Sequence, residues 1–332
     1  MNNNHLYFNN VFLNNTSSVV GKKEFEGPLS SAFDLYSNDE YFGKSSFEEA
    51  ESEMVRQNLN VLFKKAQKLP TDIDYVFGGD LVNQCVATSF AIENYQIPFI
   101  GLYGACSTAI ESIICASVFI NGGFAKNCVG VTSSHFCTAE RQYRFPLEYG
   151  SVRTPTSQNT VTASGAFLIS NTPSIIRIKS AMIGKIVDKE ITDANNMGAA
   201  MACAATNTIK RFFEDGNMKT EDFDVICTGD LGYEGHSIAR EMLNLEGLDI
   251  KTEFTDCGML IYDKNKQDIV AGGSGCGCVA SVLAGHFYKL LSNNKIKNLL
   301  IVGTGALLNT NSALSGRSIP SIAHAIHLST EA

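Results

Sequence analysis

The stretch Ile97-Pro-Phe-Ile-Gly-Leu-Tyr-Gly-Ala-Cys-Ser-Thr108 joins a short apolar run to the beginning of a longer run with helical spacing. Its first part predicts a buried strand over residues 97–103. The run from Cys106 to Asn121, which two glycines follow, predicts a helix. A strand that leads through a glycine-containing turn directly into a helix indicates an α/β fold.

Cys106 is the first candidate functional residue. The N-terminus of a helix has unpaired N–H groups and the positive end of the helix dipole, and both favour a thiolate or a bound carboxylate. Cys106 is therefore a candidate nucleophile or ligand contact, and Ser107 beside it is a candidate ligand contact. The alternative is a small buried Cys that only packs.

Three features of this part of the chain recur later in the same order. Each copy has an apolar strand that ends in Gly-Asp-Leu, a glycine-rich turn that opens a helix, and a further apolar strand. The corresponding pairs are Asp74–Leu81 with Asp224–Leu231, Tyr103–Thr108 with Gly272–Cys278, and Lys126–Thr132 with Lys297–Gly303. The recurrence predicts an internal duplication. We expect two βαβαβ halves, residues 1–173 and 174–332, in a five-layer α-β-α-β-α sandwich whose short apolar strands form parallel sheets.

The composition excludes several classes of function. The 332 residues are 44% hydrophobic and include 26 Lys and Arg against 34 Asp and Glu, which gives a net charge of −8. The apolar content excludes a disordered chain. An acidic chain without a basic block is a poor match for nucleic acid or an anionic membrane, because both attract positive charge. We therefore expect no nucleic-acid partner.

The ten cysteines and the longest uncharged runs bear on the compartment and on cofactors. A chain of this size needs no disulfides, and Met1–Asn15 is Asn-rich without the apolar stretch of a signal peptide. The runs Ile269–Tyr288 and Asn298–Gly316 contain Gly and polar residues that disfavour a membrane span. Cys276 and Cys278 lack a second Cys or His pair at metal-ligand spacing. We expect a soluble, cytoplasmic protein with no metal and no cofactor.

The duplicated halves, with a Cys at the start of the third helix of the first half, resemble the thiolase superfamily of thiolases and ketoacyl synthases. In those enzymes the Cys is acylated, and the second half supplies a His with a further His, Asn or Cys. Here the two corresponding places read Ile226-Cys-Thr-Gly-Asp-Leu231 and Ala271-Gly-Gly-Ser274, with Asp230 in the first. Because general acid–base groups contribute about 10²–10⁴-fold to catalysis, we expect a thiolase-like protein that is not an enzyme. The alternative is an active acyltransferase that uses Cys106.

A closer resemblance rests on longer motifs. They are Gly79–Gln84, Tyr103–Thr108, Ser133–Gly150, Ile191–Asp193, Ala271–Cys276 and Ser318–His324. These motifs resemble the stage V sporulation protein AD family of spore-forming Firmicutes. The resemblance implies a subunit that binds dipicolinic acid, alone or as its calcium chelate. It would act in a membrane complex that moves the acid into the forespore and releases it in germination.

The resemblance also implies where the protein acts and with which partners. It implies a peripheral location at the spore inner membrane, on the cytoplasmic side, with contacts to the membrane and soluble subunits of the same transport complex. Proteins of the thiolase superfamily are usually dimers, so a homodimer is expected. We expect it to pair through the strand Asn127–Ser133 that follows the nucleophile helix.

Dipicolinic acid is a flat pyridine with two carboxylates, so its site needs hydrogen-bond donors and a flat wall. The candidate ligand contacts are Cys106, Ser107, Arg141, Arg144, His135, Asp80, Asn83 and Asp230. Arg141 and Arg144 would share one side of a helical turn, unless they pair with neighbouring carboxylates on the surface. Asp80 and Asp230 are expected at corresponding strand ends, where α/β sheets bind ligands. The alternative for each Asp is to cap the next helix.

Overall fold

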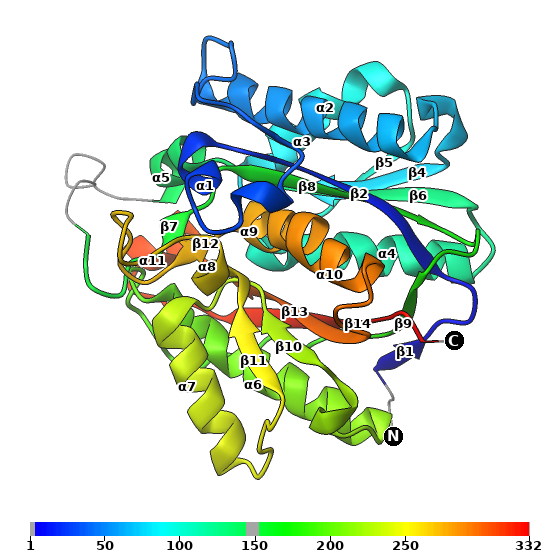
Figure 1. Ribbon diagram of the computed structural model, residues 1–332. Coiled ribbons are helices and arrows are strands. Elements are labelled where there is room, and N and C mark those ends of the chain that lie inside the picture. Colours follow the sequence, from blue (N-terminus) through cyan, green and yellow to red (C-terminus); the bar gives the residue numbers. More distant parts are fainter. Residues whose placement is uncertain (1–3, 144–152, 332) are drawn as a thin grey trace.

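Two strand–helix units of the same design build the protein (Figure 1). The computed structural model describes residues 4–143 and 153–331. The first unit consists of β2 (Phe12–Val20), α2 (Phe47–Ala66), β4 (Tyr75–Gly79), α3 (Val86–Ile92), β5 (Phe99–Gly101), α4 (Thr108–Asn121), β6 (Asn127–Ser134) and β8 (Ala163–Ser170). The second consists of β9 (Ile176–Met182), α6 (Met197–Gly216), β10 (Val225–Thr228), α7 (Gly232–Leu245), β11 (Glu253–Asp256), α9 (Cys276–Val282), α10 (Tyr288–Ser292), β13 (Asn298–Ala306) and β14 (Ser321–Ser329). The predicted boundary between residues 173 and 174 falls in the link between β8 and β9.

The main strands of the two units are hydrogen-bonded in the same order. That order is β5-β4-β6-β8-β2 in the first unit and β11-β10-β13-β14-β9 in the second, and a short pairing of β2 with β9 joins them. Shorter elements lie at the edges and in the connections: β1 (His5–Tyr7), α1 (Lys22–Phe25), β3 (Leu35–Tyr36), α5 (Phe136–Tyr143), β7 (Asn159–Thr160), α8 (Cys257–Leu260), β12 (Gly273–Ser274) and α11 (Thr310–Leu314). The matching order confirms the predicted duplication.

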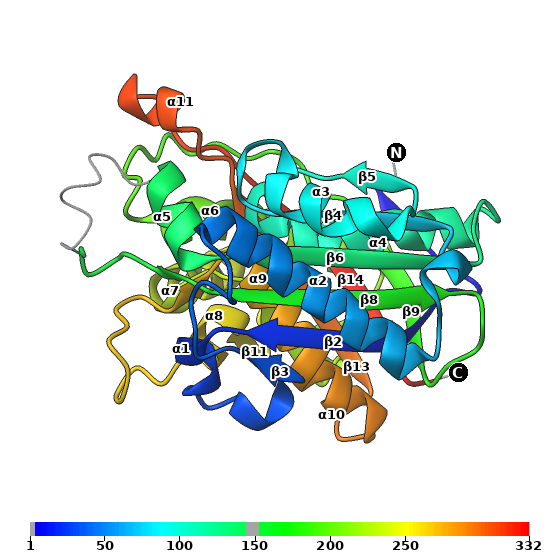
Figure 2. The ribbon, with the colours of Figure 1, turned by 90° about the horizontal axis from the view of Figure 1, so that it is seen from above.

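The described part of the chain forms the expected layers (Figures 1 and 2). α4, α9 and α10 lie between the two sets of strands, α2 and α3 cover the outer face of the first set, and α6 and α7 cover the second. Fully buried apolar side chains, among them Ile110, Phe167 and Leu283, fill the space between the sheets. The fold is therefore the predicted five-layer α/β sandwich.

The sheets are mixed, so the expectation of parallel sheets was wrong. β4, β5 and β6 are parallel, as are β10, β11 and β13. β8 and β14 run antiparallel to β6 and β13. A parallel pair needs a crossover connection, whereas β8 and β14 return beside the strand that precedes them in their unit.

β2 is a central strand that its own sequence hardly indicates. This sequence, Phe-Leu-Asn-Asn-Thr-Ser-Ser-Val-Val, is polar in the middle. Thr16 and Ser17 are nevertheless fully buried, because their hydroxyls donate to the backbone carbonyls of Ala284 and Asn58 at 2.7 and 2.9 Å. Buried hydroxyls that find carbonyl partners cost little, so a polar run is accommodated between β8 and β9.

The strand expected to pair two copies of the chain lies inside the sheet. β6 is hydrogen-bonded to β4 on one side and to β8 on the other, so neither of its edges is open to a second copy. Among the described strands β5 pairs with β4 alone, so β5 is the edge of the first unit. Within residues 4–143 and 153–331, no helix is both long and apolar enough to cross a membrane.

Candidate ligand-binding site

Cys106 lies at the seam between the two units. The chain leaves β5, makes a 3₁₀ turn over Ala105–Ser107 and enters α4. Gly104 precedes this turn, and a Cβ at Gly104 would collide with the carboxyl group of Glu111 in α4. The turn thus packs tightly on the helix and presents Cys106, whose side chain is 7% exposed, to a cavity of about 160 Å³.

The carboxyl group of Asp230 lies close enough to the Cys106 thiol for each group to shift the pKa of the other. Asp230 follows β10 and is fully buried. Its Oδ1 accepts a hydrogen bond from Thr304 Oγ1 at 2.6 Å. Its Oδ2 accepts from the backbone N–H of Gly275 at 2.8 Å and from the Ser274 hydroxyl at 3.1 Å. These three donors hold the carboxyl group in place against the sulfur.

The electrostatics around Cys106 disfavour a thiolate. Burial raises the pKa of Cys106 well above its ordinary value, and the negative charge of Asp230 raises it further. Burial also raises the pKa of Asp230, against the effect of the hydrogen bonds that it accepts. An activated Cys nucleophile needs the opposite arrangement, with a base or a cation beside the sulfur. The site therefore keeps Cys106 as a neutral thiol at neutral pH.

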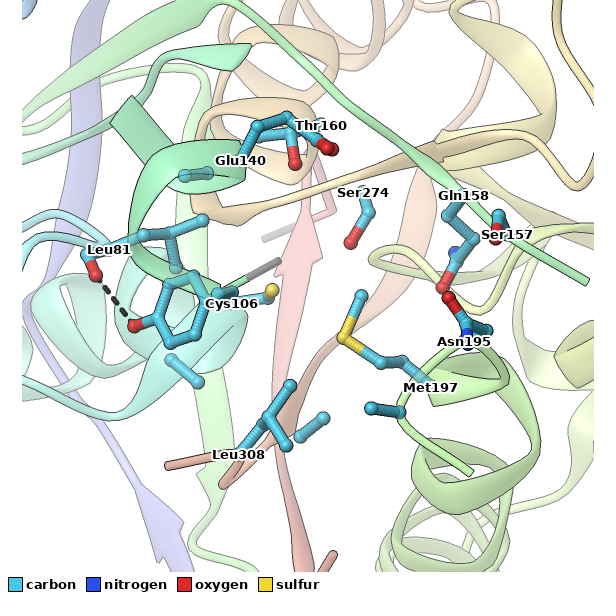
Figure 3. A pocket seen from close by; sticks show the side chains of 15 residues that line it. Leu81, Cys106, Glu140, Ser157, Gln158, Thr160, Asn195, Met197, Ser274 and Leu308 are labelled. Carbon is cyan, nitrogen blue, oxygen red and sulfur yellow. Dashed lines mark hydrogen bonds between the residues drawn. The ribbon is translucent and has the colours of Figure 1, made fainter. Parts of the chain in front are cut away.

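The cavity wall is a mixture of apolar and neutral polar side chains. Leu81, Ala139, Tyr143, Met197 and Leu308 contribute apolar surface, and Ser157, Gln158, Thr160, Asn195 and Ser274 contribute polar groups. Figure 3 shows Cys106 and Ser274 pointing into one space, with Gln158, Ser157 and Asn195 on its other side. Glu140 also lines the cavity, and no Lys, Arg or His occurs among the described lining residues.

Two of these side chains are fixed by the backbone around them. The Tyr143 hydroxyl donates to the Leu81 carbonyl at 2.6 Å, which holds the ring against the cavity. The Gln158 amide donates to the carbonyls of Asp230 and Gly273 at 2.6 and 3.2 Å. Its Oε1 is buried and has no hydrogen-bond partner among the described residues. Gln158 thus places an unused acceptor in the wall.

Asp80, Asn83 and Ser107 do not line this cavity in the described structure. Asp80 is buried and accepts hydrogen bonds from the N–H of Val82 and from the N–H and hydroxyl of Thr88, so it caps the start of α3. Asn83 is exposed, and its Oδ1 accepts from the Tyr103 hydroxyl at 3.1 Å. The Ser107 hydroxyl donates to Gly104 and Glu111 inside the turn.

His135, Arg141 and Arg144 belong to the motif Ser133–Gly150. His135 is buried, and its Nε2 bonds the carbonyl of Glu40 at 2.8 Å, outside the Cys106 cavity. The Arg141 guanidinium is half-exposed and forms an ion pair with Glu48. Arg144 lies outside the described residues. Of the eight candidate contacts, the structure brings Cys106 and Asp230 together.

Sequence reasoning missed most of the cavity wall. Ser274 lies in a glycine-rich motif that drew attention because it lacks the His and Asn of thiolase-type enzymes. Tyr143 stands beside Arg141 and Arg144, where its sequence position suggests a proton donor or a ring face for a ligand. Gln158 and Asn195 lie in irregular segments with no motif of their own, and only the packing of the two units brings them to Cys106.

The fold and the position of Cys106 define the class of protein. The structure is similar to 3-oxoacyl-[acyl-carrier-protein] synthase III from Aquifex aeolicus VF5, with a TM-score of 0.59 at 12% identity over 96% of this chain and 99% of that one. It is also similar to acetyl-CoA acetyltransferase from Syntrophomonas wolfei, with a TM-score of 0.58 at 11% identity over 98% and 100% of the two chains. The chain therefore has the thiolase fold.

The sequence narrows this class to one family. The family model of stage V sporulation protein AD matches residues 3–329. Stage V sporulation protein AD of Bacillus subtilis (strain 168) is 42% identical over 316 residues, which are 95% of this chain and 93% of that protein. The chain belongs to the stage V sporulation protein AD family and has a role in sporulation.

Proposed function

We propose that the protein binds dipicolinic acid, alone or as its calcium chelate, in the cavity beside Cys106 and performs no chemistry on it. It does so as a subunit of a spore inner-membrane complex that takes up the acid in sporulation and releases it in germination. The family membership supports the sporulation role. The observation that carries the non-catalytic part is the carboxyl group of Asp230 beside the Cys106 thiol.

The shape and chemistry of the cavity support a flat, polar ligand. The Tyr143 ring and the apolar side chains offer a wall for a pyridine ring, and the hydroxyls and amides offer donors for carboxylate oxygens. The N-terminus of α4 begins two residues after Cys106, and the positive end of its dipole suits an anion. Because the described lining has no cationic side chain, a dianion gains from arriving with its own cation. This favours the calcium chelate over the free acid.

The same site argues against acyl transfer. A thiol whose pKa is raised by burial and by a neighbouring carboxyl group is a weak nucleophile near neutral pH. The positions that supply bases in thiolase-type enzymes here supply Asp230 and Ser274. Exposure of the protein to acyl-CoA followed by mass spectrometry tests this point. We expect no stable adduct on Cys106, and an adduct would favour the acyltransferase alternative.

Isothermal titration calorimetry tests the binding proposal. Dipicolinic acid, with and without equimolar Ca²⁺, is titrated into the wild type and into Cys106→Ala and Asp80→Ala. We expect saturable binding by the wild type, tighter with Ca²⁺, and weaker binding by Cys106→Ala. Asp80→Ala tests whether the site extends to that cap, from which we expect little change. A wild type that shows no saturation at millimolar ligand would leave the protein a structural subunit with an unused cavity.

The place in the cell and the partners follow from the same proposal. The chain would attach to the cytoplasmic face of the spore inner membrane through the membrane and soluble subunits of the transport complex. It would act there as a homodimer. The edge strand β5 offers unpaired backbone groups for pairing with a second copy. Ile100 in β5 and Tyr103 just after it are exposed on this side.

A further inference from the structure

A second cavity, of about 150 Å³, lies behind the wall that closes the Cys106 cavity. The two cavities share α5 and β7 as a partition. Tyr143 of α5 and Thr160 of β7 line the Cys106 cavity. Phe136 of α5 and Asn159 of β7 line the second cavity. The two cavities are thus separate. The second has Lys and Arg in its lining, whereas the described lining of the first has neither.

Two cationic side chains from distant parts of the chain converge on the second cavity. Lys23 in α1 and Arg153 both line it and are both half-buried, whereas Lys22, which also belongs to the lining, is exposed and pairs with Glu26. The Lys23 ammonium donates to the backbone carbonyl of Asp268 at 3.1 Å and to Asn159 Oδ1 at 3.4 Å, which are neutral acceptors. The Arg153 guanidinium lies over the Phe136 ring, 5.5 Å from its centroid. Among residues 4–143 and 153–331, no carboxylate forms an ion pair with either cation.

The acidic residues of this cavity are engaged elsewhere or stand apart from the two cations. The buried carboxyl group of Glu24 accepts hydrogen bonds from the Tyr262 hydroxyl and from the N–H of Thr162, and burial raises the pKa of Glu24. Glu40 gives its backbone carbonyl to His135, and its carboxylate lies beyond ion-pair distance of both cations. Burial, and then the positive charge of Arg153, lower the pKa of Lys23, whereas the negative charges of Asp268, Glu24 and Glu40 raise it to a smaller extent. The two cations therefore face one space in which the nearest carboxylates offset their charge only in part.

We propose that this second cavity binds a small anion with two negative charges, held between Lys23 and Arg153. An ammonium and a guanidinium are the donors that proteins use for phosphate and carboxylate groups, and the guanidinium can donate two parallel hydrogen bonds. A dianion would relieve the repulsion between the two cations, which a single negative charge does only in part. The site is separate from the one proposed for dipicolinic acid and does not depend on it.

Titration calorimetry at constant ionic strength tests the proposal, with inorganic phosphate and malonate as dianions and acetate as the monovalent control. We expect one saturable site for a dianion and weaker binding of acetate. A response to phosphate alone assigns a phosphate site, and a response to both assigns a general dianion site. Lys23→Gln and Arg153→Gln should each weaken binding about tenfold or more. Lys251→Gln is the matched control, because Lys251 is exposed, pairs with Glu221 and lies outside the lining of this cavity.

A second measurement uses the wild type alone and so does not depend on how the variants fold. The rates at which acetic anhydride acetylates Lys251 and Lys23 are compared by mass spectrometry with and without phosphate. We expect phosphate to protect Lys23 several-fold and to leave the exposed Lys251 unchanged. Absence of saturable dianion binding, equal binding by the variants, or equal acetylation of Lys23 in both conditions would overturn the proposal.

Discussion

At the scale of single residues, the carboxyl group of Asp230 beside Cys106 disfavours the thiolate that a nucleophile would need. The sequence predicted both Cys106 at a helix start and Asp230 at a strand end, and the structure joins them. The rest of the cavity wall could not be predicted from the sequence, because Gln158 and Asn195 belong to no local sequence pattern. Their side chains reach Cys106 only through the packing of the two units. The role of Asp80 could not be predicted either, because an Asp that caps a helix and an Asp that contacts a ligand look the same in the sequence.

Removal of the charge beside Cys106 should make the thiol more reactive. Asp230→Asn keeps an acceptor for Gly275 and Ser274 and removes the negative charge that raises the pKa of Cys106. We expect alkylation of Cys106 by iodoacetamide at pH 8 to be slow in the wild type and about tenfold faster in the variant. Peptide mass spectrometry measures both rates. Asp80→Asn is the control, and equal rates in all three proteins would show that Asp230 does not suppress the thiolate.

The buried carboxyl group of Glu51 should make the stability of the folded protein depend on pH. Glu51 is fully buried in α2, where the hydroxyls of Ser133 and Thr138 donate to its carboxyl group. Burial and the charge of Asp80 raise the pKa of Glu51 to about 8 from an ordinary 4.5. Between these values the folded protein retains a proton that the unfolded chain releases, so stability should fall as the pH rises from 4.5 to 8.

Glu51→Gln should therefore reduce this slope and raise the free energy of unfolding at pH 8 by on the order of 2 kcal/mol. Urea denaturation of both proteins at pH 5 and pH 8 measures the effect. The exposed Glu93→Gln serves as the control and should follow the wild type. An unchanged slope in the Glu51→Gln variant would place the pH dependence in another group.

At the scale of elements, the start of a helix can be predicted where the capping residues lie next to it in the sequence. The sequence Ser46-Phe-Glu-Glu49 is a capping box, and in the structure Ser46 Oγ accepts from the Glu49 N–H at 3.3 Å at the start of α2. β2 was missed because its buried hydroxyls bind carbonyls of other elements, which no local pattern records. The predicted parallel direction of β8 and β14 was also wrong, because strand direction depends on how the chain connects across the sheet.

The contact between β8 and α9 offers a test at this scale. A Cβ at Gly165 in β8 would collide with the backbone of Ala280 in α9, so this Gly sets how closely the helix packs on the sheet. We expect Gly165→Ala to lower the free energy of unfolding by ~2 kcal/mol. In Gly101→Ala the new Cβ would meet only the Phe99 ring, at 3.5 Å, so this control should change little. Thermal unfolding that ranks the two variants equally would contradict close packing at Gly165.

At the scale of the whole molecule, the duplication gives two equivalent sheets, and β5 forms one edge of the pair. The predicted homodimer would pair through this edge rather than through β6. Lys on an exposed edge strand opposes pairing with another chain. Ile100→Lys in β5 should therefore convert the dimer to a monomer in analytical ultracentrifugation at micromolar concentration. Leu314→Lys, on the exposed helix α11, should leave the mass unchanged. A wild type that sediments as a monomer would contradict the homodimer.

Dipicolinic acid is proposed to occupy the cavity beside Cys106, and calorimetric titration of a cavity-filling variant tests this proposal. Ala194 lies in the cavity wall ahead of α6, and Thr192 is exposed two residues away and outside the wall. Wild type and Thr192→Trp should have the same affinity as each other for dipicolinic acid, whether it is titrated alone or with Ca²⁺. Ala194→Trp should lose binding while its thermal unfolding stays unchanged. Equal binding by all three proteins would place the ligand elsewhere and contradict the account.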